Sequence, residues 1–319
     1  MYDVITIGTV TRDVFVTLPT NNVCFDAGTK TETEAPVFAV GGGAANAAVT
    51  FARAQLKTAA LFRVGTDRAG DDIIKDLQNE GIECWENRDE KKATAYATIL
   101  LTPNIERTIM VYRGASEDMP QNAIPFQKLK SKWAYIVPSH INIETMEKIV
   151  EHCYYQGIAI AMNPSQFYLD QRAKRLKKFL DKLKVLIVNR EEAAYLTGMP
   201  REREKDIFNR LDEMVDGIAV MTDGPHGAWV SDGKCLYHTG IFKNHAVVDR
   251  TGAGDAFGAG FVAGLLMKED IEYALRLASA NATAVVEHVG GHAGALTRHE
   301  FENTSRWKHL DITTHEIHT

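Results

Sequence analysis

The feature that most constrains this chain is an alternation of short apolar runs with segments of helical pattern. Six runs are apolar almost throughout instead of alternating with polar residues: "DVITIG", "AALFRVG", "WAYIVPS", "IAIAMNPS", "VLIVN" and "GIAVMTDG". Strands buried on both faces of a parallel sheet have this composition. Helix-like segments such as "DDIIKDLQNEG" and "ETMEKIVEHCYYQG" lie between them. The sequence therefore predicts a doubly wound α/β fold, with ligands bound beyond the carboxyl ends of the strands.

Two stretches, residues 12–39 and 91–113, break this pattern. They are rich in threonine, valine and turn residues and contain no good helix. They predict the strands and hairpins of a small β subdomain over the ligand edge of the sheet, while 1–11, 40–90 and 114–319 form the large α/β domain. An outer face of this subdomain would suit a dimer contact through Tyr96, Ile99, Leu101, Ile109 and Val111. The tail "HLDITTHEIHT" is expected to be a frayed end.

Composition excludes several classes of protein. The formal net charge of −6 gives no general attraction to nucleic acid or to anionic lipid. No apolar run approaches the roughly 18 residues of a membrane span, and the N-terminus lacks the basic region of a signal peptide. The four cysteines lie far apart without a C-x-x-C pair, which favours a reducing compartment. We therefore expect a cytoplasmic protein with no nucleic-acid or membrane partner.

The stretch "DRTGAGDAFGAG" places one carboxylate among very small residues. Gly252, Ala253 and Gly254 predict a tight turn, with a helix that starts near Asp255. The free amide groups at such a start favour an anion, so this is a candidate phosphate cradle. Asp255 is either a helix N-cap or a catalyst. The chain contains no Walker string, and the dinucleotide fingerprint would need glycine where Phe257 stands.

The stretch "VGGGAANAAVTFARA" is a second glycine turn before a helix of small residues. Gly41, Gly43 and Asn46 nearly imitate the dinucleotide fingerprint, and Asp67 follows roughly twenty residues later, so a dehydrogenase is one hypothesis. Against it, Asn46 replaces the third glycine, and the turn follows a β excursion instead of opening the first βαβ unit.

The alternative is a polyol site. The backbone amides of Gly42, Gly43 and Asn46 would bind hydroxyl groups of a sugar-like ligand. Asp13, just past the first strand, would join them, since an ionised carboxylate accepts hydrogen bonds from two hydroxyls.

Two further strand ends carry candidate residues. In "VLIVNREEAAYLTG", Asn189 and Glu192 form either a capping box or a site for Mg²⁺ and its waters near nucleotide phosphates. In "VMTDGPHGAWV", Thr222, Gly224 and Gly227 lie at another strand end, and a hairpin turn explains them equally well.

Taken together and in this order, the segments resemble the PfkB family of carbohydrate kinases, also called the ribokinase-like family. The two signatures are "GGGAANAAVTFARAQLKTAALFRVGTDRAGD" and "DRTGAGDAFGAGFVAGL", and the resemblance spans nearly the whole chain. It implies a ribokinase-like fold in which the β excursions form a lid. It also implies transfer of the γ-phosphate of ATP to a hydroxymethyl group of a sugar, with Mg²⁺ and, in many members, a potassium ion.

The resemblance implies a role for each matching position. Asp255 matches the catalytic base, and the amides of Gly252, Ala253 and Gly254 match the anion hole. The positions that match the nucleotide pocket are Asn189, Thr222, Gly224, Gly227 and Asn281. Glu192, with Asn189, matches the motif associated with Mg²⁺, contacted through water. The positions that match the sugar contacts are Asp13, Gly42, Gly43 and Asn46. Asp249 lies where many members hold potassium.

The sequence also departs from the ribose-specific pattern. "GTVTRD" has Thr9 and Thr11 where ribose-specific members resemble G-S-x-N-x-D, which weakens the case for ribose itself. Arg113 stands where a neutral residue is frequent, so a carboxylated or phosphorylated sugar is one candidate acceptor. A nucleoside, as in an adenosine-like kinase, is another. A catalytically silent sugar-binding protein is a remote alternative, and a homodimer through the lid is expected.

Overall fold

The computed structural model describes residues 1–104, 107–170, 178–243 and 246–317. The strands are β1 (Tyr2–Gly8), β2 (Thr11–Thr17), β3 (Val37–Gly41), β4 (Thr58–Gly65), β5 (Glu83–Asp89), β6 (Tyr96–Leu101), β7 (Arg107–Tyr112), β8 (Ser131–Val137), β9 (Ala159–Met162), β10 (Val185–Asn189), β11 (Ile218–Thr222), β12 (Ala228–Ser231), β13 (Cys235–Thr239) and β14 (Ile312–Glu316). The helices are α1 (Gly43–Arg53), α2 (Arg68–Asn79), α3 (Ile143–Tyr155), α4 (Gln166–Leu169), α6 (Arg190–Thr197), α7 (Glu204–Asp212), α8 (Ala253–Lys268), α9 (Ile271–Val286) and α10 (Arg298–Asn303).

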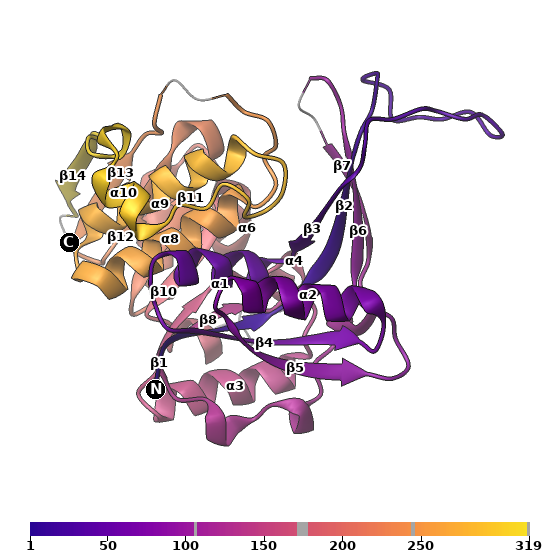
Figure 1. Ribbon diagram of the computed structural model, residues 1–319. Coiled ribbons are helices and arrows are strands. Elements are labelled where there is room, and N and C mark those ends of the chain that lie inside the picture. Colours follow the sequence, from indigo (N-terminus) through magenta and orange to yellow (C-terminus); the bar gives the residue numbers. More distant parts are fainter. Residues whose placement is uncertain (105–106, 171–177, 244–245, 318–319) are drawn as a thin grey trace.

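A ten-stranded sheet forms the centre of the molecule (Figure 1). Its order is β14-β13-β12-β11-β10-β9-β8-β1-β4-β5. The seven strands from β11 to β5 are parallel, and β12, β13 and β14 add antiparallel strands at one edge. The six apolar runs correspond to β1, β4, β8, β9, β10 and β11. The predicted doubly wound, mostly parallel fold is confirmed.

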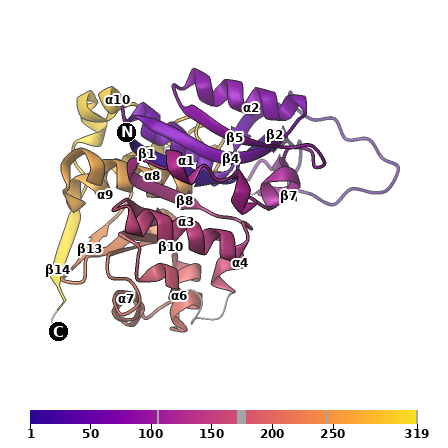
Figure 2. The ribbon, with the colours of Figure 1, turned by 90° about the horizontal axis from the view of Figure 1, so that it is seen from below.

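Helices cover both faces of this sheet, as Figure 2 shows for α2 on one side and α3, α6 and α7 on the other. On β10, Leu186 and Val188 pack with the helices α3, α4, α6 and α7. Val185 and Ile187, the alternate residues, pack with α1, α8 and α9. Because successive side chains of a strand point to opposite faces, a strand covered on both sides has to be apolar at every position. No helix in the described ranges is long and apolar enough to cross a membrane.

Glycines let α8 lie very close to its neighbours. A Cβ atom at Gly264 would lie 2.4 Å from Cα of Ala274 on α9, and one at Gly260 would lie 3.0 Å from Cα of Ala278. One at Gly258 would lie 2.5 Å from the Tyr135 hydroxyl on β8. These contacts fix α8 against both α9 and the sheet.

A separate four-stranded sheet, order β3-β2-β6-β7, projects from the carboxyl edge of the main sheet (Figure 1). We call this sheet, with its loops, the lid. Its strands differ slightly from the predicted ranges 12–39 and 91–113, because β2 begins at Thr11 and β3 ends at Gly41. The two central strands, β2 and β6, are parallel, whereas the outer pairs are antiparallel. Since β3 leads directly into α1, the lid and the main domain share this junction.

The prediction that Ile99 and Leu101 lie on an exposed outer face of the lid is wrong. Ile99 and Leu101 are buried, and they form a small apolar cluster with Phe15 and Ala97. Pleating is the reason, because Tyr96 and Ile99 are three positions apart on one strand and therefore point to opposite faces. Ile109 and Val111, on the edge strand β7, are exposed.

The C-terminal tail also differs from expectation. Residues Ile312–Glu316 form β14, which pairs in antiparallel register with β13, and Ile317 donates a backbone hydrogen bond to Lys234. Thr313 and Thr314 suit a strand, but the sequence has no long apolar run here because β14 is a mostly exposed edge strand.

We predict that Gly264→Val destabilises the protein by about 3 kcal/mol, since overpacking a tight helix contact costs about 1–3 kcal/mol and here the clash is with backbone. Urea unfolding measures the change. Gly240→Val is the matched control, because a Cβ atom at Gly240 meets nothing within 4 Å. Equal unfolding free energies for the two variants would contradict the close α8–α9 contact.

Candidate active site

The start of α8 lies at the carboxyl edge of the main sheet. Gly252 precedes the helix with φ of 78°, and a Cβ atom there would lie 2.1 Å from the carbonyl oxygen of Gly291. Ala253 makes only a long 3.4 Å hydrogen bond to the Arg250 carbonyl, and Gly254 is exposed. This helix start therefore presents backbone N–H groups to solvent, as a phosphate cradle requires.

Asp255, in the first turn of α8, is held by a residue from α1. Asn46 Nδ2 donates a hydrogen bond of 2.8 Å to Asp255 Oδ2. Burial raises the pKa of Asp255, and the hydrogen bond from Asn46 opposes that rise. A Cβ atom at Gly43 would lie 3.1 Å from Oδ1, the other oxygen of Asp255. The same Cβ atom would lie 2.4 Å from Cγ1 of Val137, so glycine at position 43 lets this turn lie close to both Val137 and Asp255. No cap hydrogen bond from the Asp255 side chain is seen, because Gly252 is the N-cap residue.

Asp13, on lid strand β2, lies near Asp255. Its side chain is 5% exposed and accepts a 2.5 Å hydrogen bond from Thr11 Oγ1. Burial raises the pKa of Asp13 to about 6, with a smaller rise from the charges of Asp249 and Asp255. A Cβ atom at Gly41 would lie 1.8 Å from Asp13 Oδ2, so a larger residue there would displace this carboxylate. Two carboxylates, Asp13 and Asp255, thus lie at one site.

The glycine turn before α1 has the geometry that its sequence requires. Gly42 precedes the helix with φ of 88°, and a Cβ atom there would lie 2.5 Å from the Thr9 carbonyl oxygen. The backbone amide of Asn46 donates to the Gly42 carbonyl at 3.0 Å, within the first turn of the helix. The side-chain amide of Asn46 therefore faces the candidate site, whereas its backbone N–H does not.

Asn189 and Glu192 form a complete capping box at the start of α6. Glu192 N donates to Asn189 Oδ1 and Asn189 N donates to Glu192 Oε2, both at 2.8 Å. Burial raises the pKa of Glu192. Asn189 pairs in register with Thr222 of β11, so these two strand ends are neighbours. Over the described ranges, no group of three or more His, Cys, Asp or Glu side chains is arranged to hold a metal ion.

A pocket of about 400 Å³ opens between α8, α9 and the turn after β11. This volume falls in the range of about 300–1,000 Å³ found for small-molecule sites. Thr222, Gly224 and Gly227 line it, as do Ala253 and Gly254. The apolar part of its wall is Ile241, Val247, Phe257, Ala282 and Val286.

Asn281 does not line this pocket. Its side chain is 1% exposed, donates to the Ala256 carbonyl at 2.9 Å and to Thr50 Oγ1 at 3.2 Å, and accepts from Leu296 N at 2.9 Å. These bonds join α9 to α1, α8 and the following loop. Asn281 therefore serves as an internal link beside the pocket.

Asp249 is similarly enclosed. It is 1% exposed, and its carboxylate accepts hydrogen bonds from the backbone and hydroxyl of Thr251 and from Gly290 N. These contacts tie the segment before the helix start, which forms no strand, to the loop that follows α9.

Several residues of the site were not found from the sequence. Ser279, Ala282, Thr283 and Val286 line the pocket at helical spacing on one face of α9, a signal that periodicity analysis could have detected. Arg107 lines the pocket from the lid, which no local pattern indicates. The loop after α9 contributes His292, whose ring contacts Asn46.

Comparison with known proteins identifies relatives over most of the chain. The profile described as "pfkB family carbohydrate kinase" matches residues 1–298. The ribokinase of Bacillus subtilis (strain 168) is 27% identical over 270 residues, which cover 82% of this chain and 86% of that protein. The cytidine kinase of Thermococcus kodakarensis is 26% identical over 257 residues, covering 78% and 88%.

Solved structures have the same fold. A probable sugar kinase from Rhizobium etli superposes with a TM-score of 0.83 at 21% identity, covering 96% of this chain and 99% of that one. The adenosine kinase from Sinorhizobium meliloti superposes with a TM-score of 0.81 at 21% identity, covering 95% and 99%. Because these identities are low, the superpositions show the fold alone.

We predict that Asp13→Asn stabilises the free protein near pH 8 by about 3 kcal/mol. The pKa of Asp13 is about 6 in the folded chain against the usual 3.8, so the folded state binds this proton more tightly than the unfolded state does. The ionised carboxylate thus lowers stability above pH 6, and this loss disappears as pH falls from 6 to 4. Urea unfolding between pH 4 and 8 measures the difference.

The control for this prediction is Asp26→Asn, on an exposed loop of the lid. It should leave stability nearly unchanged at every pH. A constant difference between wild type and Asp13→Asn from pH 4 to 8 would refute the raised pKa.

Proposed function

The chain belongs to the pfkB family of carbohydrate kinases, whose members are phosphotransferases with an alcohol group as acceptor, and we propose that it transfers the γ-phosphate of ATP to a hydroxymethyl group of a sugar. One observation carries this proposal: Asp255 lies in the first turn of the helix whose exposed N-terminus ends the 400 Å³ pocket. A base and a phosphate cradle then occupy neighbouring positions on one rigid helix.

Asp255 acts as the general base. Oδ2 accepts the hydrogen bond from Asn46, so we assign Oδ1, which lies beside Gly43, to the acceptor hydroxyl. As this oxygen takes the hydroxyl proton, the acceptor oxygen bonds to the γ-phosphorus. The bond from phosphorus to the β–γ bridging oxygen breaks, and ADP leaves. The amides of Gly252, Ala253 and Gly254 stabilise the charge on the transferring group.

The pocket binds the nucleotide. Thr222, Gly224 and Gly227 line its side at the end of β11, and the apolar wall of α9 suits the base. Asn281, which matches a nucleotide-pocket position of the family, supports α9 from inside. Lid residue Arg107 also lines this pocket and supplies a positive charge near the phosphates.

Two metal ions belong to the proposal. The Glu192 carboxylate uses Oε2 in the capping box, which leaves Oε1 to bind a water of Mg²⁺ while Asn189 keeps the strand end in place. A single carboxylate suits Mg²⁺ that is held mainly by nucleotide phosphates. The buried Asp249 carboxylate fits a potassium ion, since burying a charge is costly without a counter-charge. Both ions would offset phosphate charge when bound.

The acceptor binds between Asp13 of the lid and the turn at Gly42 and Gly43. Asp13 accepts hydrogen bonds from two sugar hydroxyls, and Asn46 keeps Asp255 in reach of a third. At the far end of this region, Arg113 Nη1 donates to Ser139 Oγ at 3.3 Å, which supports testing acceptors that carry a carboxylate or phosphate. A nucleoside is the second candidate acceptor, supported by the relative named cytidine kinase.

A dehydrogenase and a silent binding protein explain these contacts less well. At the position of the third fingerprint glycine, Asn46 is bonded to Asp255. A silent protein would have no need for a partly buried carboxylate beside an open helix start. Cytoplasmic location stays a prediction from the cysteine pattern.

We also propose that two chains pair through the lid. Met110 and Tyr112 on edge strand β7 and Phe38 on edge strand β3 are 53–55% exposed. Register places Thr98 beside Met110 and Tyr96 beside Tyr112, so these side chains share one face of the sheet. A face of this kind on a four-stranded sheet favours pairing with a second sheet.

Asp255→Asn should reduce turnover about 10²–10⁴-fold, because it removes the base but keeps the hydrogen-bond geometry. ADP release from ATP and Mg²⁺ is measured with ribose, fructose, 2-keto-3-deoxygluconate, fructose phosphates, adenosine and cytidine, each with and without potassium. Calorimetry checks that the variant still binds ATP and the acceptor.

Asp270→Asn is the matched control, since Asp270 caps α9 away from the site and should not affect turnover. If wild type binds acceptors but no acceptor yields ADP, the chain is a silent binding protein. If Asp255→Asn retains full turnover with a clear acceptor, the assignment of the base fails.

We predict that the wild type sediments as a dimer and that Met110→Glu sediments as a monomer, because a charge on the lid face opposes burial of that face. Tyr155→Glu, at an exposed aromatic residue on α3, should leave the dimer intact. Sedimentation velocity at micromolar concentration distinguishes these outcomes. A wild-type monomer, or a dimeric Met110→Glu, would refute pairing through the lid.

A further inference from the structure

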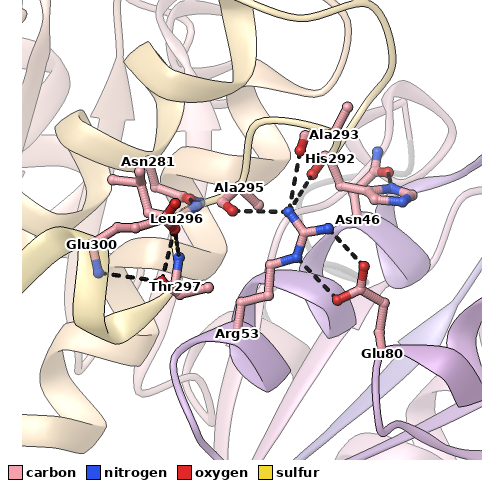
Figure 3. A network of polar contacts seen from close by, with 10 residues as sticks. All are labelled: Asn46, Arg53, Glu80, Asn281, His292, Ala293, Ala295, Leu296, Thr297 and Glu300. Carbon is pink, nitrogen blue, oxygen red and sulfur yellow. Dashed lines mark hydrogen bonds and ion pairs between the residues drawn. The ribbon is translucent and has the colours of Figure 1, made fainter.

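A short polar chain extends behind Asp255, on the side away from the proposed acceptor. Asn46 Nδ2 donates to Asp255 Oδ2 at 2.8 Å, and Asn46 Oδ1 lies 3.0 Å from His292 Nδ1. Figure 3 shows the His292 ring beside Asn46, next to the network around Arg53. Asn46 is 4% exposed, so water does not replace either partner easily. The Asn46 amide is thus enclosed between a carboxylate and an imidazole.

We propose that His292 is a positioning residue for Asp255: its Nδ1–H fixes the side-chain amide of Asn46 in the one orientation that donates to the base. The inference rests on the proposed function, in which Asp255 is the general base. His292 itself has no contact with substrate in this proposal and acts only through Asn46.

The chemistry of the three groups gives the chain a direction. An ionised carboxylate only accepts hydrogen bonds, so the nitrogen of the Asn46 amide has to face Asp255. Asn46 Oδ1 then faces His292, and a carbonyl oxygen also only accepts. Nδ1 of His292 therefore carries a proton. If the amide turned over, its oxygen would face a carboxylate oxygen and its NH₂ would face an N–H, two repulsive contacts at once.

The surroundings of His292 keep the ring neutral. Burial and, to a smaller extent, the charge of Arg53 on α1 lower the pKa of His292 to about 4, against the opposite effect of Glu80 and Asp76 on the α2 side. The single ring proton of neutral His292 is then on Nδ1. The base has its own titratable neighbours, because the Asp255 charge raises the pKa of Asp13 on β2 and that of Tyr135 on β8.

The backbone that carries His292 is anchored from the same helix that carries Asn46. Arg53 Nη1 donates to the carbonyl oxygens of Ala295 at 2.9 Å, Ala293 at 3.2 Å and His292 at 3.4 Å. Glu80 holds the other side of this guanidinium with hydrogen bonds of 2.6 and 3.0 Å (Figure 3). Arg53 lies seven residues, about two helical turns, after Asn46, so both contacts face one side of α1.

Close packing fixes the loop at its other end. A Cβ atom at Gly291 would lie 2.6 Å from Asn46 Nδ2, and the Gly291 carbonyl lies against Gly252 at the start of α8. The loop is thus fitted between the two helix starts, and the His292 ring has a defined place beside Asn46. Without a donor at Nδ1, Asn46 Oδ1 would be a buried acceptor that lacks a partner.

The test compares His292→Asn with His292→Leu. The two new side chains have nearly the same shape, but only asparagine places an N–H near the position of Nδ1. The activity assay uses the acceptor that the wild type turns over, with kcat and KM for ATP and acceptor measured from pH 5 to 9. Thermal unfolding of both variants monitors the fold.

We expect His292→Leu to lower kcat about 10- to 100-fold. This is the range found when a residue that orients a metal-binding side chain through a hydrogen bond is removed. KM for ATP should be unchanged. The acid limb of kcat/KM should move to higher pH, because the Asn46 hydrogen bond that lowers the pKa of Asp255 is weakened. His292→Asn should restore most of kcat and the position of the acid limb.

Equal activity of wild type and His292→Leu, or equal losses in both variants, would overturn the positioning role while leaving Asp255 as the base. Nitrogen-15 NMR of the wild-type imidazole gives a readout that needs no turnover: we expect the Nδ1–H form at pH 7, and the Nε2–H form would overturn the inference. If the wild type has no kinase activity and Asp255→Asn behaves like the wild type, the proposed function on which the inference rests is refuted instead.

Discussion

The hydrogen bond between Asn46 and Asp255 is the contact on which the site depends. It joins the first turns of α1 and α8, two helices that are 209 residues apart in the sequence at this contact. Both helices point their N-termini toward the carboxyl edge of the sheet, so two sets of free N–H groups and one carboxylate meet there. Positive helix ends beside a partly buried carboxylate provide favourable electrostatics without a single lysine or arginine in the first turns.

Small residues make that meeting possible. Side chains at Gly258, Gly260 and Gly264 would push α8 from the sheet and from α9. Gly252 and Gly291 perform the same function for the loop that lies between the helix starts. The glycines of the signature are therefore of two kinds: some expose backbone to a ligand, and others set the distance between helices. Asn281 belongs with the second kind, because its three hydrogen bonds join α9, α1 and α8.

Sequence analysis could predict the elements whose cause is local. Apolar runs indicated the buried strands, and the spacing of Asn189 and Glu192 indicated the capping box that the structure contains. It could not predict contacts that depend on which distant segments meet. His292 has no pattern that relates it to Asn46, and Arg107 reaches the pocket only because the lid is placed above it.

The strand β14 was missed for a related reason: an exposed edge strand needs no apolar run, and its partner β13 is more than seventy residues earlier. The expected face of the lid was also assigned without regard to the pleat, which puts Tyr96 and the buried Ile99 on opposite faces.

The lid has a core of its own, built from Phe15, Ala97, Ile99 and Leu101, and this core is separate from the larger clusters on the main sheet. Four buried side chains are few for a sheet to maintain its position unaided. Asp13 is on this sheet, whereas Asp255 is on the main domain, so a molecule held by both carboxylates would add to the contacts that already join the two parts, such as the Arg12–Asp76 ion pair and the packing of Val289 on the lid core. An acceptor in that position would contribute to the tertiary structure as well as react, because it would contact the lid and the main domain at once. A correct acceptor would then strengthen the contact between the lid and the main domain. An acceptor that fits poorly would leave this contact weaker.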